Sequence, residues 1–396
     1  MKLRFTVIIT LFAGLFSYGQ TFSPQNSGVS VQLNAIDFFS PSVGMVAGNS
    51  GVIRKTSDSG LNWTASNSGT MQDLTGIAFL NATTCLAVGK NGTILKTTNS
   101  GTSWSTVNSG TTNDLTGIFV NGLNMYVTGV NGTILISTNS GNAWTATNTG
   151  ISFKLNKIFF VSDLIGYAVG DGGTILKTIN AGQAWNFLTS GTNTHSLTDV
   201  YFTDGNTGVV TGGITASNEA IILRTTNAGS IWTSNTFSGT VLNGLGFYPD
   251  NSLGFAVGGS FSGNTSVIMK TTGQGASWSP VSSSSSRQLA VCFPGNGIGY
   301  SCGLNGTILR LAANTADLEE NDELGIQIGP NPGNGIFEVS GNLSGDFSIE
   351  VLAANGQRVA FVKNGNEIDL RACPKGIYFA VICSEKSTIM RKLVKE

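Results

Sequence analysis

Short apolar runs alternate with clusters of Gly, Ser, Thr and Asn along most of the chain, and this alternation repeats. The clearest unit is Gly92-Thr-Ile-Leu-Lys-Thr-Thr-Asn-Ser-Gly-Thr-Ser-Trp104, in which the Trp lies twelve residues after the first Gly. The six units that keep this distance start at Gly51, Gly92, Gly132, Gly173, Ala220 and Ser266. A shortened seventh unit begins at Gly306 and is not followed by Trp. A period of about 40 to 50 residues with strand-type content predicts stacked units of β-sheet.

Each unit carries the signals of four strands. The first strand is a run such as residues 115–118, and corresponding runs begin at Leu33, Leu74, Leu155, Leu197, Leu242 and Leu289. The second ends in Val-Gly or a close variant, as at Val88-Gly89. The third is the β-rich run Thr-Ile-Leu-Lys-Thr, and the Trp begins the fourth after a Thr-Asn-Ser-Gly turn. Four strands in each of seven units predict an all-β fold, a seven-bladed β-propeller over residues 20–312.

The N-terminal segment supplies the strand that the seventh unit lacks. Phe22-Ser-Pro-Gln-Asn-Ser-Gly28 is similar to the stretches that follow Trp63 and Trp104, and Phe22 lies 41 residues before Trp63. We therefore expect Phe22 to occupy the Trp position of the last blade, because joining both ends in one blade removes an open sheet edge. The aromatic residues expected to have this structural role are Phe22, Trp63, Trp104, Trp144, Trp185, Trp232 and Trp278.

The turn before each Trp resembles the Asp-box, or bacterial neuraminidase repeat, with the pattern Ser/Thr-x-Asp-x-Gly-x-x-Trp. Residues 56–63 match it in full, with Asp58 in the Asp position, whereas Asn replaces Asp in four units and Gly273 in the sixth. The whole period looks most like the photosystem II stability/assembly factor-like propellers. This resemblance covers about residues 21–312 and implies the fold, since similar boxes also occur in sialidases, xyloglucanases and sortilin-type receptors.

Residues 1–19 have the features of a signal peptide. Lys2 and Arg4 precede the apolar residues 5–16, and Ser17-Tyr18-Gly19 is a small-x-small cleavage site. Twelve apolar residues are too few to span a bilayer. We therefore expect export across the inner membrane and no transmembrane segment in the mature chain. The formal net charge of −1 argues against nucleic-acid binding, which needs a basic excess.

The last part of the chain loses the repeat. Residues 313–324 read as an acidic linker, and residues 325–396 predict a small antiparallel β-sandwich without catalytic groups. Their landmarks are Pro330-Asn-Pro332, the hairpin signal Asn355-Gly356 and Lys375-Gly-Ile-Tyr378, followed by a basic end. In this order they resemble the C-terminal sorting domain of the type IX secretion system. The resemblance implies contact between residues 325–396 and that secretion machinery, and a secreted or surface-attached protein.

The propeller sequence offers little for catalysis, so we expect no catalytic, cofactor-binding or metal-binding residues. A sialidase needs an arginine cluster, and the few propeller arginines are spread along the repeats. Glu219 is the only Glu of the propeller, whereas most glycosidases use two carboxylates. An Asp could supply the second carboxylate beside Glu219. His195 is the only His, and its surroundings in the sequence favour a loop residue over a metal ligand.

Two further sets of residues have alternative interpretations. One offset of the third strand carries a basic residue in six units: Lys55, Lys96, Lys177, Arg224, Lys270 and Arg310. We expect these to be solubilising blade edges, and the alternative is a ring that binds an acidic surface. The five cysteines are Cys85, Cys292, Cys302, Cys373 and Cys383. Export permits disulfides between Cys292 and Cys302 and between Cys373 and Cys383, but the spacing does not fix the connectivity.

Two neighbouring units are longer than the others between their second and third strands. Most units have two residues there, whereas the fifth has residues 213–219 and the sixth has residues 259–265. Both insertions should lie on the face opposite the Trp-containing turns. Because loops on a rigid scaffold often carry recognition, we interpret them as a binding edge, with tolerated variation in loop length as the alternative. The candidate contact residues are Asn218, Glu219, Phe261 and Asn264.

These observations favour an exported, non-enzymatic β-propeller that binds or scaffolds an unknown partner at the cell surface or envelope. The alternative is a glycan-binding protein or glycoside hydrolase of the sialidase-like or xyloglucanase-like group. An acidic pair in the central cleft would favour the alternative, and a polar rim without such a pair would favour the first.

Overall fold

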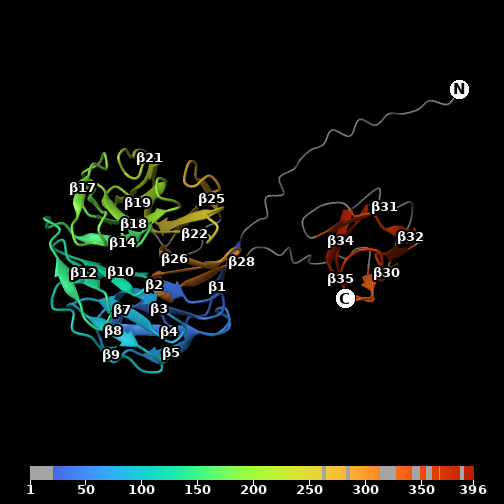
Figure 1. The fold of residues 1–396 in the computed structure, drawn as a ribbon, viewed down its shortest axis with the longest axis horizontal. Helices are drawn as coiled ribbons and strands as arrows, with labels where there is room; N and C mark the ends of the chain where they lie inside the picture. The colour runs from blue at the N-terminus through green and yellow to red at the C-terminus, as the bar shows by residue number, and fades with distance from the viewer. Residues whose placement is uncertain are drawn as a thin grey trace. The chain divides into compact units, whose positions relative to one another are not determined.

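The computed structural model describes residues 21–260, 265–281, 286–312, 327–340, 348–353, 359–364, 366–383 and 388–396. The chain divides into two compact units, Met1–Ala313 and Asn314–Glu396. In the first unit, seven four-stranded antiparallel sheets surround a common axis, which confirms the predicted seven-bladed propeller (Figure 1). The predicted signal peptide, the acidic linker and the Asn355-Gly356 hairpin lie outside the described residues. Within the described ranges, no helix has the length and apolar character needed to cross a membrane.

Each blade is a meander of four strands, numbered outward from the propeller axis. The first blade consists of β2 (Leu33–Phe38), β3 (Gly44–Gly48), β4 (Val52–Thr56) and β5 (Thr64–Asn67). The second consists of β6 (Leu74–Phe79), β7 (Cys85–Gly89), β8 (Ile94–Thr97) and β9 (Ser105–Thr106). The third consists of β10 (Leu115–Asn121), β11 (Asn124–Gly129), β12 (Ile134–Ser137) and β13 (Thr145–Thr147). The fourth blade consists of β14 (Leu155–Phe160), β15 (Gly166–Gly170), β16 (Ile175–Thr178) and β17 (Asn186–Leu188). The fifth consists of β18 (Ser196–Phe202), β19 (Gly208–Ile214), β20 (Glu219–Thr225) and β21 (Thr233–Ser238). The sixth consists of β22 (Val241–Phe247), β23 (Gly254–Gly259), β24 (Ser266–Thr271) and β25 (Ser279–Val281). Two short 3-10 helices, η1 (Asn49–Gly51) and η2 (Leu304–Gly306), lie in the turns before β4 and β28.

The seventh blade closes the ring with strands from both ends of the propeller sequence. Its order is β26 (Gln288–Gly295), β27 (Ile298–Gly303), β28 (Ile308–Ala312) and β1 (Thr21–Gln25). Ser23 pairs with Arg310 as Thr64 pairs with Lys55, so Phe22 occupies the position that Trp63 has in the first blade. Its ring packs edge-on against Phe255 of the sixth blade, with 5.8 Å between the ring centres.

The hydrophobic core lies between neighbouring blades, and the repeat Trp residues are part of it. Each cluster joins residues of two adjacent blades; Trp63, for example, packs with Phe38 of its own blade and Tyr300 of the seventh. Trp63, Trp185 and Trp232 are 7 %, 9 % and 9 % exposed, while Trp104, Trp144 and Trp278 are half-buried. Large aromatic side chains thus contribute much of the apolar area buried between neighbouring blades.

The segment of eight residues that ends in each Trp, which we call the box turn, is held by side-chain acceptors. In the first box turn, the Thr56 hydroxyl accepts the Gly60 N–H at 2.9 Å, and Asp58 Oδ1 accepts the Asn62 N–H at 2.9 Å. Asn99 accepts the equivalent N–H, from Ser103, at 2.9 Å. An acceptor oxygen is used at this position, and a charge is not required, which explains why Asn replaces Asp in four units. The sixth box turn, with Gly273 there, keeps the bond from the Gly275 N–H to the Thr271 hydroxyl, at 3.1 Å.

A ring of hydrogen bonds links the innermost strands. In six blades the residue that follows the repeat Leu of the inner strand donates to the backbone carbonyl of the corresponding Leu, or of Gln288, in the next inner strand, at 2.5–3.0 Å; the donors are Asn34, Thr75, Thr116, Asn156, Thr198 and Asn243. The seventh blade has Leu289 in this position, and the Cys302 thiol contacts the Leu33 carbonyl instead, at 3.6 Å.

The seventh inner strand corrects our alignment of the repeats. Gln288 rather than Leu289 corresponds to Leu33, since Gln288 pairs with Gly303 as Leu33 pairs with Gly48. The buried Gln288 amide donates to the Ser286 carbonyl at 2.7 Å and accepts from the Ser301 hydroxyl at 2.9 Å. These two bonds satisfy its polar atoms, so the fold tolerates Gln where six blades have Leu.

The second unit consists of two antiparallel sheets. One has the order β29 (Gln327–Gly329), β30 (Ile336–Ser340), β33 (Glu367–Asp369) and β32 (Val362–Asn364), and the other has β31 (Ser348–Ala353), β34 (Gly376–Cys383) and β35 (Thr388–Lys395). Phe337 and Ile368 of the first sheet form one buried cluster with Val351 and Leu393 of the second. The sheets therefore pack face to face, as predicted for a β-sandwich. Lys395 Nζ donates to the carbonyls of Leu370 and Arg371, at 3.0 and 2.9 Å, and thereby holds the C-terminal strand.

Candidate functional sites of the propeller

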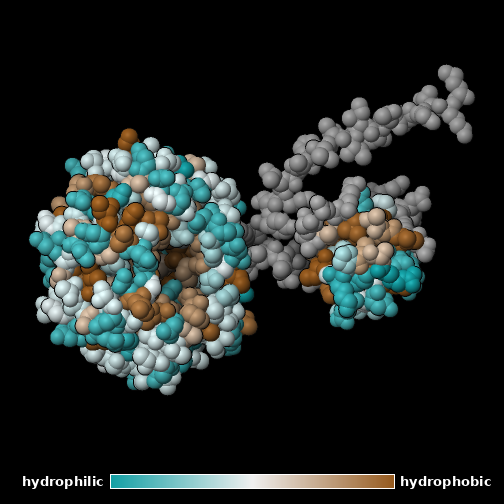
Figure 2. All heavy atoms as spheres, in the orientation of Figure 1, coloured by the Kyte–Doolittle hydropathy of each residue, from teal (hydrophilic) through white to brown (hydrophobic). Residues whose placement is uncertain are grey.

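The seven inner strands surround a central channel that widens into two hollows. Strands alternate in direction, so the inner strands end on the same face as the box turns. The hollow on that face has a volume of about 380 Å³ and the hollow on the opposite face about 280 Å³. Figure 2 shows a depression at the propeller axis with hydrophobic residues around it. Both hollows reach Lys157 and Asp199, so these charged residues lie where the two meet.

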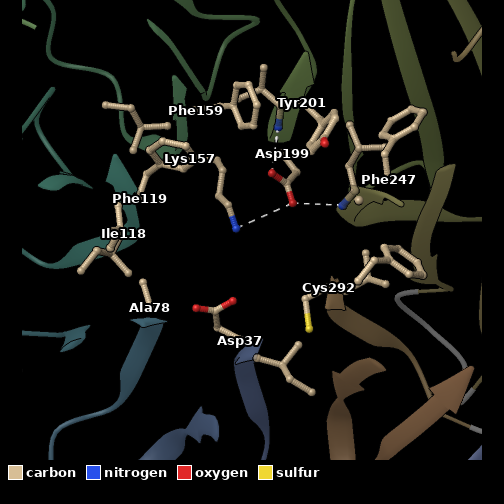
Figure 3. Close-up of a pocket in the computed structure, with 18 of the residues that line it drawn as sticks. Asp37, Ala78, Ile118, Phe119, Lys157, Phe159, Asp199, Tyr201, Phe247 and Cys292 are labelled. Carbon is tan, nitrogen blue, oxygen red and sulfur yellow. Dashed lines mark hydrogen bonds and ion pairs between the residues drawn. The ribbon is translucent and has the colours of Figure 1, made fainter. Parts of the chain in front are cut away.

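Aromatic side chains form the wall of the larger hollow, which we call the aromatic hollow (Figure 3). Phe119, Phe159, Tyr201 and Phe247 come from four successive blades, and their ring centres are 5.2, 4.9 and 4.9 Å apart along the series. Three of these rings, all except Phe247, are only half-buried. The wall is therefore a continuous aromatic arc with access to solvent.

Two carboxylates and one ammonium group point into the aromatic hollow. Lys157 Nζ lies 3.8 Å from Asp199 Oδ2, and Asp37 extends from the first blade on another side of the channel (Figure 3). Asp199 also accepts the N–H groups of Val200, at 2.9 Å, and Leu245, at 3.0 Å. Asp37 accepts the Phe79 N–H at 2.8 Å. Each carboxylate thus holds the inner strand of the next blade.

Burial dominates the electrostatics of this group. It raises the pKa of Asp37 to about 6, against the opposing effects of hydrogen bonds from the Phe79 and Phe38 N–H groups and of the Lys157 charge. Burial also raises the pKa of Asp199, although Lys157 and two backbone N–H groups favour its charged form. Desolvation penalises the ionised carboxylate, and these partners compensate only in part.

The sequence analysis missed this acidic pair. We found no clear pair of acids there, because 162 positions separate Asp37 from Asp199. A signal exists in the repeat alignment: Asp199 stands where other blades have Gly76 or Gly117, and Asp37 where they have Ala78 or Phe119. Charged residues at the inner-strand positions that face the propeller axis therefore indicate where the channel lies.

The two insertions, by contrast, were recognised from the sequence, and they lie against each other. The fifth-blade insertion extends the β19–β20 hairpin, in which Ile214 pairs with Glu219. Asn218 Nδ2 donates to Ser260 Oγ of the sixth-blade insertion at 2.8 Å. Both insertions join second and third strands and so lie on the face opposite the box turns. Phe261 and Asn264 fall outside the described residues.

Glu219 and His195 form a pair at the base of the fifth-blade insertion. Glu219 Oε1 lies 3.3 Å from His195 Nε2, and the Thr192 hydroxyl lies 2.7 Å from His195 Nδ1. His195 is a buried residue of the loop directly before β18, whereas the Glu219 side chain is 40 % exposed. In the described part of the chain, no group of three or more His, Cys, Asp or Glu residues is arranged to hold a metal ion. The pair anchors the hairpin and leaves one carboxylate face open to solvent.

Four of the six basic residues of the third strands hold blades together, which corrects both of our interpretations for those four. Lys55, Lys96, Lys177 and Arg224 donate to carbonyls in the box turn of the following blade, at 2.7–3.2 Å; the acceptors are Ser100, Ser140, Ala228 and Gln274. In the third blade Ile136 has this position, and the Tyr126 hydroxyl donates to the Ala181 carbonyl at 3.3 Å. The side chains of Lys55, Lys96, Lys177 and Arg224 are therefore inter-blade links, and they do not form part of a free ring for an acidic ligand.

No disulfide joins the described cysteines of the propeller. Cys85, Cys292 and Cys302 are free, and Cys373 of the second unit is free as well. Cys292 pairs with Tyr300 and Cys302 pairs with Ala290, so the two cysteines are not directly opposite each other in the β26–β27 hairpin. Burial raises the pKa of Cys292 well above its ordinary value, which keeps this thiol protonated and unreactive.

One family model matches the C-terminal part of the chain. Residues 327–396 match the family described as the secretion system C-terminal sorting domain, which indicates type IX secretion to the cell surface or beyond. No curated protein matches the chain in sequence.

Solved structures resemble the propeller. YCF48 bound to a D1 peptide is 16 % identical with a TM-score of 0.59, covering 74 % of this chain and 94 % of that one. YCF48 from Cyanidioschyzon merolae is 15 % identical with a TM-score of 0.58, covering 74 % and 99 %. The GH74 xyloglucanase from Xanthomonas campestris is 10 % identical with a TM-score of 0.59, covering 73 % of this chain and 53 % of that one. At these identities the likeness concerns the fold alone.

Proposed function

We propose that the protein is an exported, non-enzymatic binding or scaffold module that contacts a partner protein through the insertions of the fifth and sixth blades. The observation that carries this proposal is the hydrogen bond of 2.8 Å between Asn218 and Ser260, which joins the two insertions into one edge. Elsewhere on the same face the corresponding turns are short and repetitive. Longer loops on one face of a regular scaffold often form a recognition site in repeat folds.

The polar groups of this edge suit a protein partner. Glu219 is anchored by His195 and still 40 % exposed, so a partner can reach a carboxylate that is already positioned. Preorganisation of this kind lowers the entropy lost on binding. We further propose that residues 1–19 direct the chain across the inner membrane, that the box turns are of the Asp-box type, and that residues 325–396 contact the secretion machinery.

The acidic pair in the channel is the specific observation in favour of the second candidate, a glycan-binding or glycan-cleaving protein. Aromatic rings beside two carboxylates are common in sugar sites, and one structural neighbour is a GH74 xyloglucanase. A hydrolase, however, needs one protonated and one ionised carboxyl group. Here Asp37 and Asp199 each accept a backbone N–H group of the next inner strand. Each carboxylate therefore has a structural role in the fold that does not depend on a glycan.

The test of the first proposal is to shorten residues 213–219 and 259–265 to two-residue turns, singly and together, and to measure capture of native cell-surface proteins. We expect the shortened forms to lose a specific partner while their melting temperature stays the same. Met71→Ala is the matched control, since Met71 is 80 % exposed in the link before the second blade, on the same face. Equal recovery of the partner by all forms would show that the insertions are variation in loop length.

The second candidate is tested separately by incubating the full chain with xyloglucan and other β-glucans and by a glycan array. Release of reducing ends that disappears in both Asp37→Asn and Asp199→Asn would establish a hydrolase. Glycan binding without cleavage would establish the binding form of that candidate.

A further inference from the structure

The aromatic hollow combines two features that rarely occur together in a structural core. Its wall is an arc of half-buried rings, among them Phe119, Phe159 and Tyr201. The Tyr201 hydroxyl is bonded to Asn251 Oδ1 at 3.1 Å, so its polar atom is occupied by its own neighbourhood. A core would close such rings off from solvent, whereas here they border a space of about 380 Å³.

The charges in the hollow are not balanced. Lys157 lies 3.8 Å from Asp199 and also favours the charged form of Asp37 from a longer distance, but Asp37 makes no ion pair within 4 Å with any described residue. Asp37 and Asp199 project from different blades into the same space, with Lys157 beside Asp199 (Figure 3). If all three groups are ionised, two carboxylates face one ammonium group. A partly buried carboxylate without a cation is costly, and an incoming cation lowers that cost.

We propose that the aromatic hollow binds an organic cation, an alkylammonium or guanidinium group, with Asp37 as its counter-ion and the aromatic arc as its wall. Ring faces attract cations through their quadrupole, most strongly where water is excluded. An anion would meet two carboxylates and an ammonium group that is already engaged. A purely apolar ligand would cover Asp37 without compensating its charge.

Two sources can present this group, a free small cation or a Lys or Arg side chain on an exposed segment of a partner protein. A volume of about 380 Å³ accommodates one long side chain or a small amine. The hollow opens on the box-turn face, opposite the insertions. This site is therefore independent of the proposed insertion edge, and either can fail without the other.

The test uses the full chain and calorimetric or NMR titration with four probes: N-acetyl-lysine N-methylamide, N-acetyl-arginine N-methylamide, tetramethylammonium and the neutral isostere N-acetyl-norleucine N-methylamide. We expect saturable binding of the cations and at least tenfold weaker binding of the norleucine derivative. Stronger binding of the Lys and Arg derivatives than of tetramethylammonium indicates a partner segment, and the reverse order indicates a free small cation.

Two variants and one change of pH assign the site. Asp37→Asn should weaken cation binding at least tenfold, and Phe159→Leu, which keeps an apolar side chain, about threefold or more. Cation binding to the parent protein should weaken from pH 7.5 to pH 5, because the carboxylates of Asp37 and Asp199 take up protons. The other titratable groups that line the hollow are Lys157, Tyr201 and Cys292. Equal binding of the cationic and neutral probes, or cation binding unchanged in both variants, would overturn the proposal.

Discussion

Replacement of a repeat Trp tests how the blades are held together. Trp104 packs in the cluster between the first two blades, against Met45 and Ala87 among others, and its Nε1 donates to Ser66 Oγ at 2.9 Å. Truncation of a large aromatic residue in a core costs about 3–5 kcal/mol in free energy of unfolding, because transfer and cavity terms add. Since Trp104 is half-buried, we expect Trp104→Ala to lie near 3 kcal/mol, the lower end of that range.

The contribution of the indole N–H can be separated with a matched pair. Trp144 is half-buried as well, but its Nε1 is buried without a hydrogen-bond partner. Trp→Phe keeps most of the ring in both places. It breaks a hydrogen bond only at residue 104, where we expect an additional loss of about 1 kcal/mol. At residue 144 the same change removes an unsatisfied donor.

Urea denaturation of the full chain, followed by tryptophan fluorescence and circular dichroism, measures these differences. We expect the order of stability parent, Trp144→Phe, Trp104→Phe and Trp104→Ala, from highest to lowest. An unchanged midpoint for Trp104→Ala would refute the view that these residues hold neighbouring blades together. A larger loss for Trp144→Phe than for Trp104→Phe would refute the role assigned to Ser66.

Three further predictions concern the tail, the channel and the inter-blade links. Deletion of residues 325–396 should leave a folded propeller that is not exported, measured by surface labelling; normal surface display would contradict the sorting role. The folded-state pKa of Asp37 lies at about 6, above the ordinary 3.8, so its effect on stability is fully favourable below pH 3.8 and is lost as the pH rises through 6. Asp37→Asn should therefore be more stable than the parent at pH 7.5, by up to about 3 kcal/mol, and should lose that advantage at pH 4, in denaturation curves at both values. A constant difference would argue against a desolvated carboxylate. Lys96→Met, which removes bonds of 2.7 Å to Ser140 and Asn142, should cost about 1 kcal/mol, whereas Ile136→Lys should not destabilise; equal melting temperatures for parent and Lys96→Met would remove the inter-blade role.

The repeat allowed most of the propeller to be predicted from sequence. A constant distance to Trp and a regular Gly turn specify the same four strands in every unit, because local turn chemistry and strand periodicity agree. Closure of the ring followed from the 41-residue offset between Phe22 and Trp63. The alignment was wrong by one residue at Gln288, where a polar residue occupies a buried position that apolar patterning assigns to Leu289.

The channel could not be predicted in the same way, because it depends on contacts between blades far apart in sequence. Asp37, Lys157 and Asp199 come from the first, fourth and fifth blades, and only closure of the ring brings them together. The basic residues of the third strands were misread for a related reason. Their partners are backbone carbonyls such as that of Ser140, 44 positions after Lys96. Every residue has a backbone carbonyl, so the sequence does not indicate which one accepts the bond. Position within the repeat was predictable, and the partner of each side chain was not.

The central claim, that the insertions of the fifth and sixth blades contact a partner, is tested most directly by hydrogen–deuterium exchange. The full chain is compared alone and with the protein captured from the cell surface. We predict slower exchange in the β19–β20 and β23–β24 hairpins, around Asn218 and Ser260, with little change in the box turns. Protection confined to the box turns or the inner strands, with both hairpins unchanged, would contradict the account.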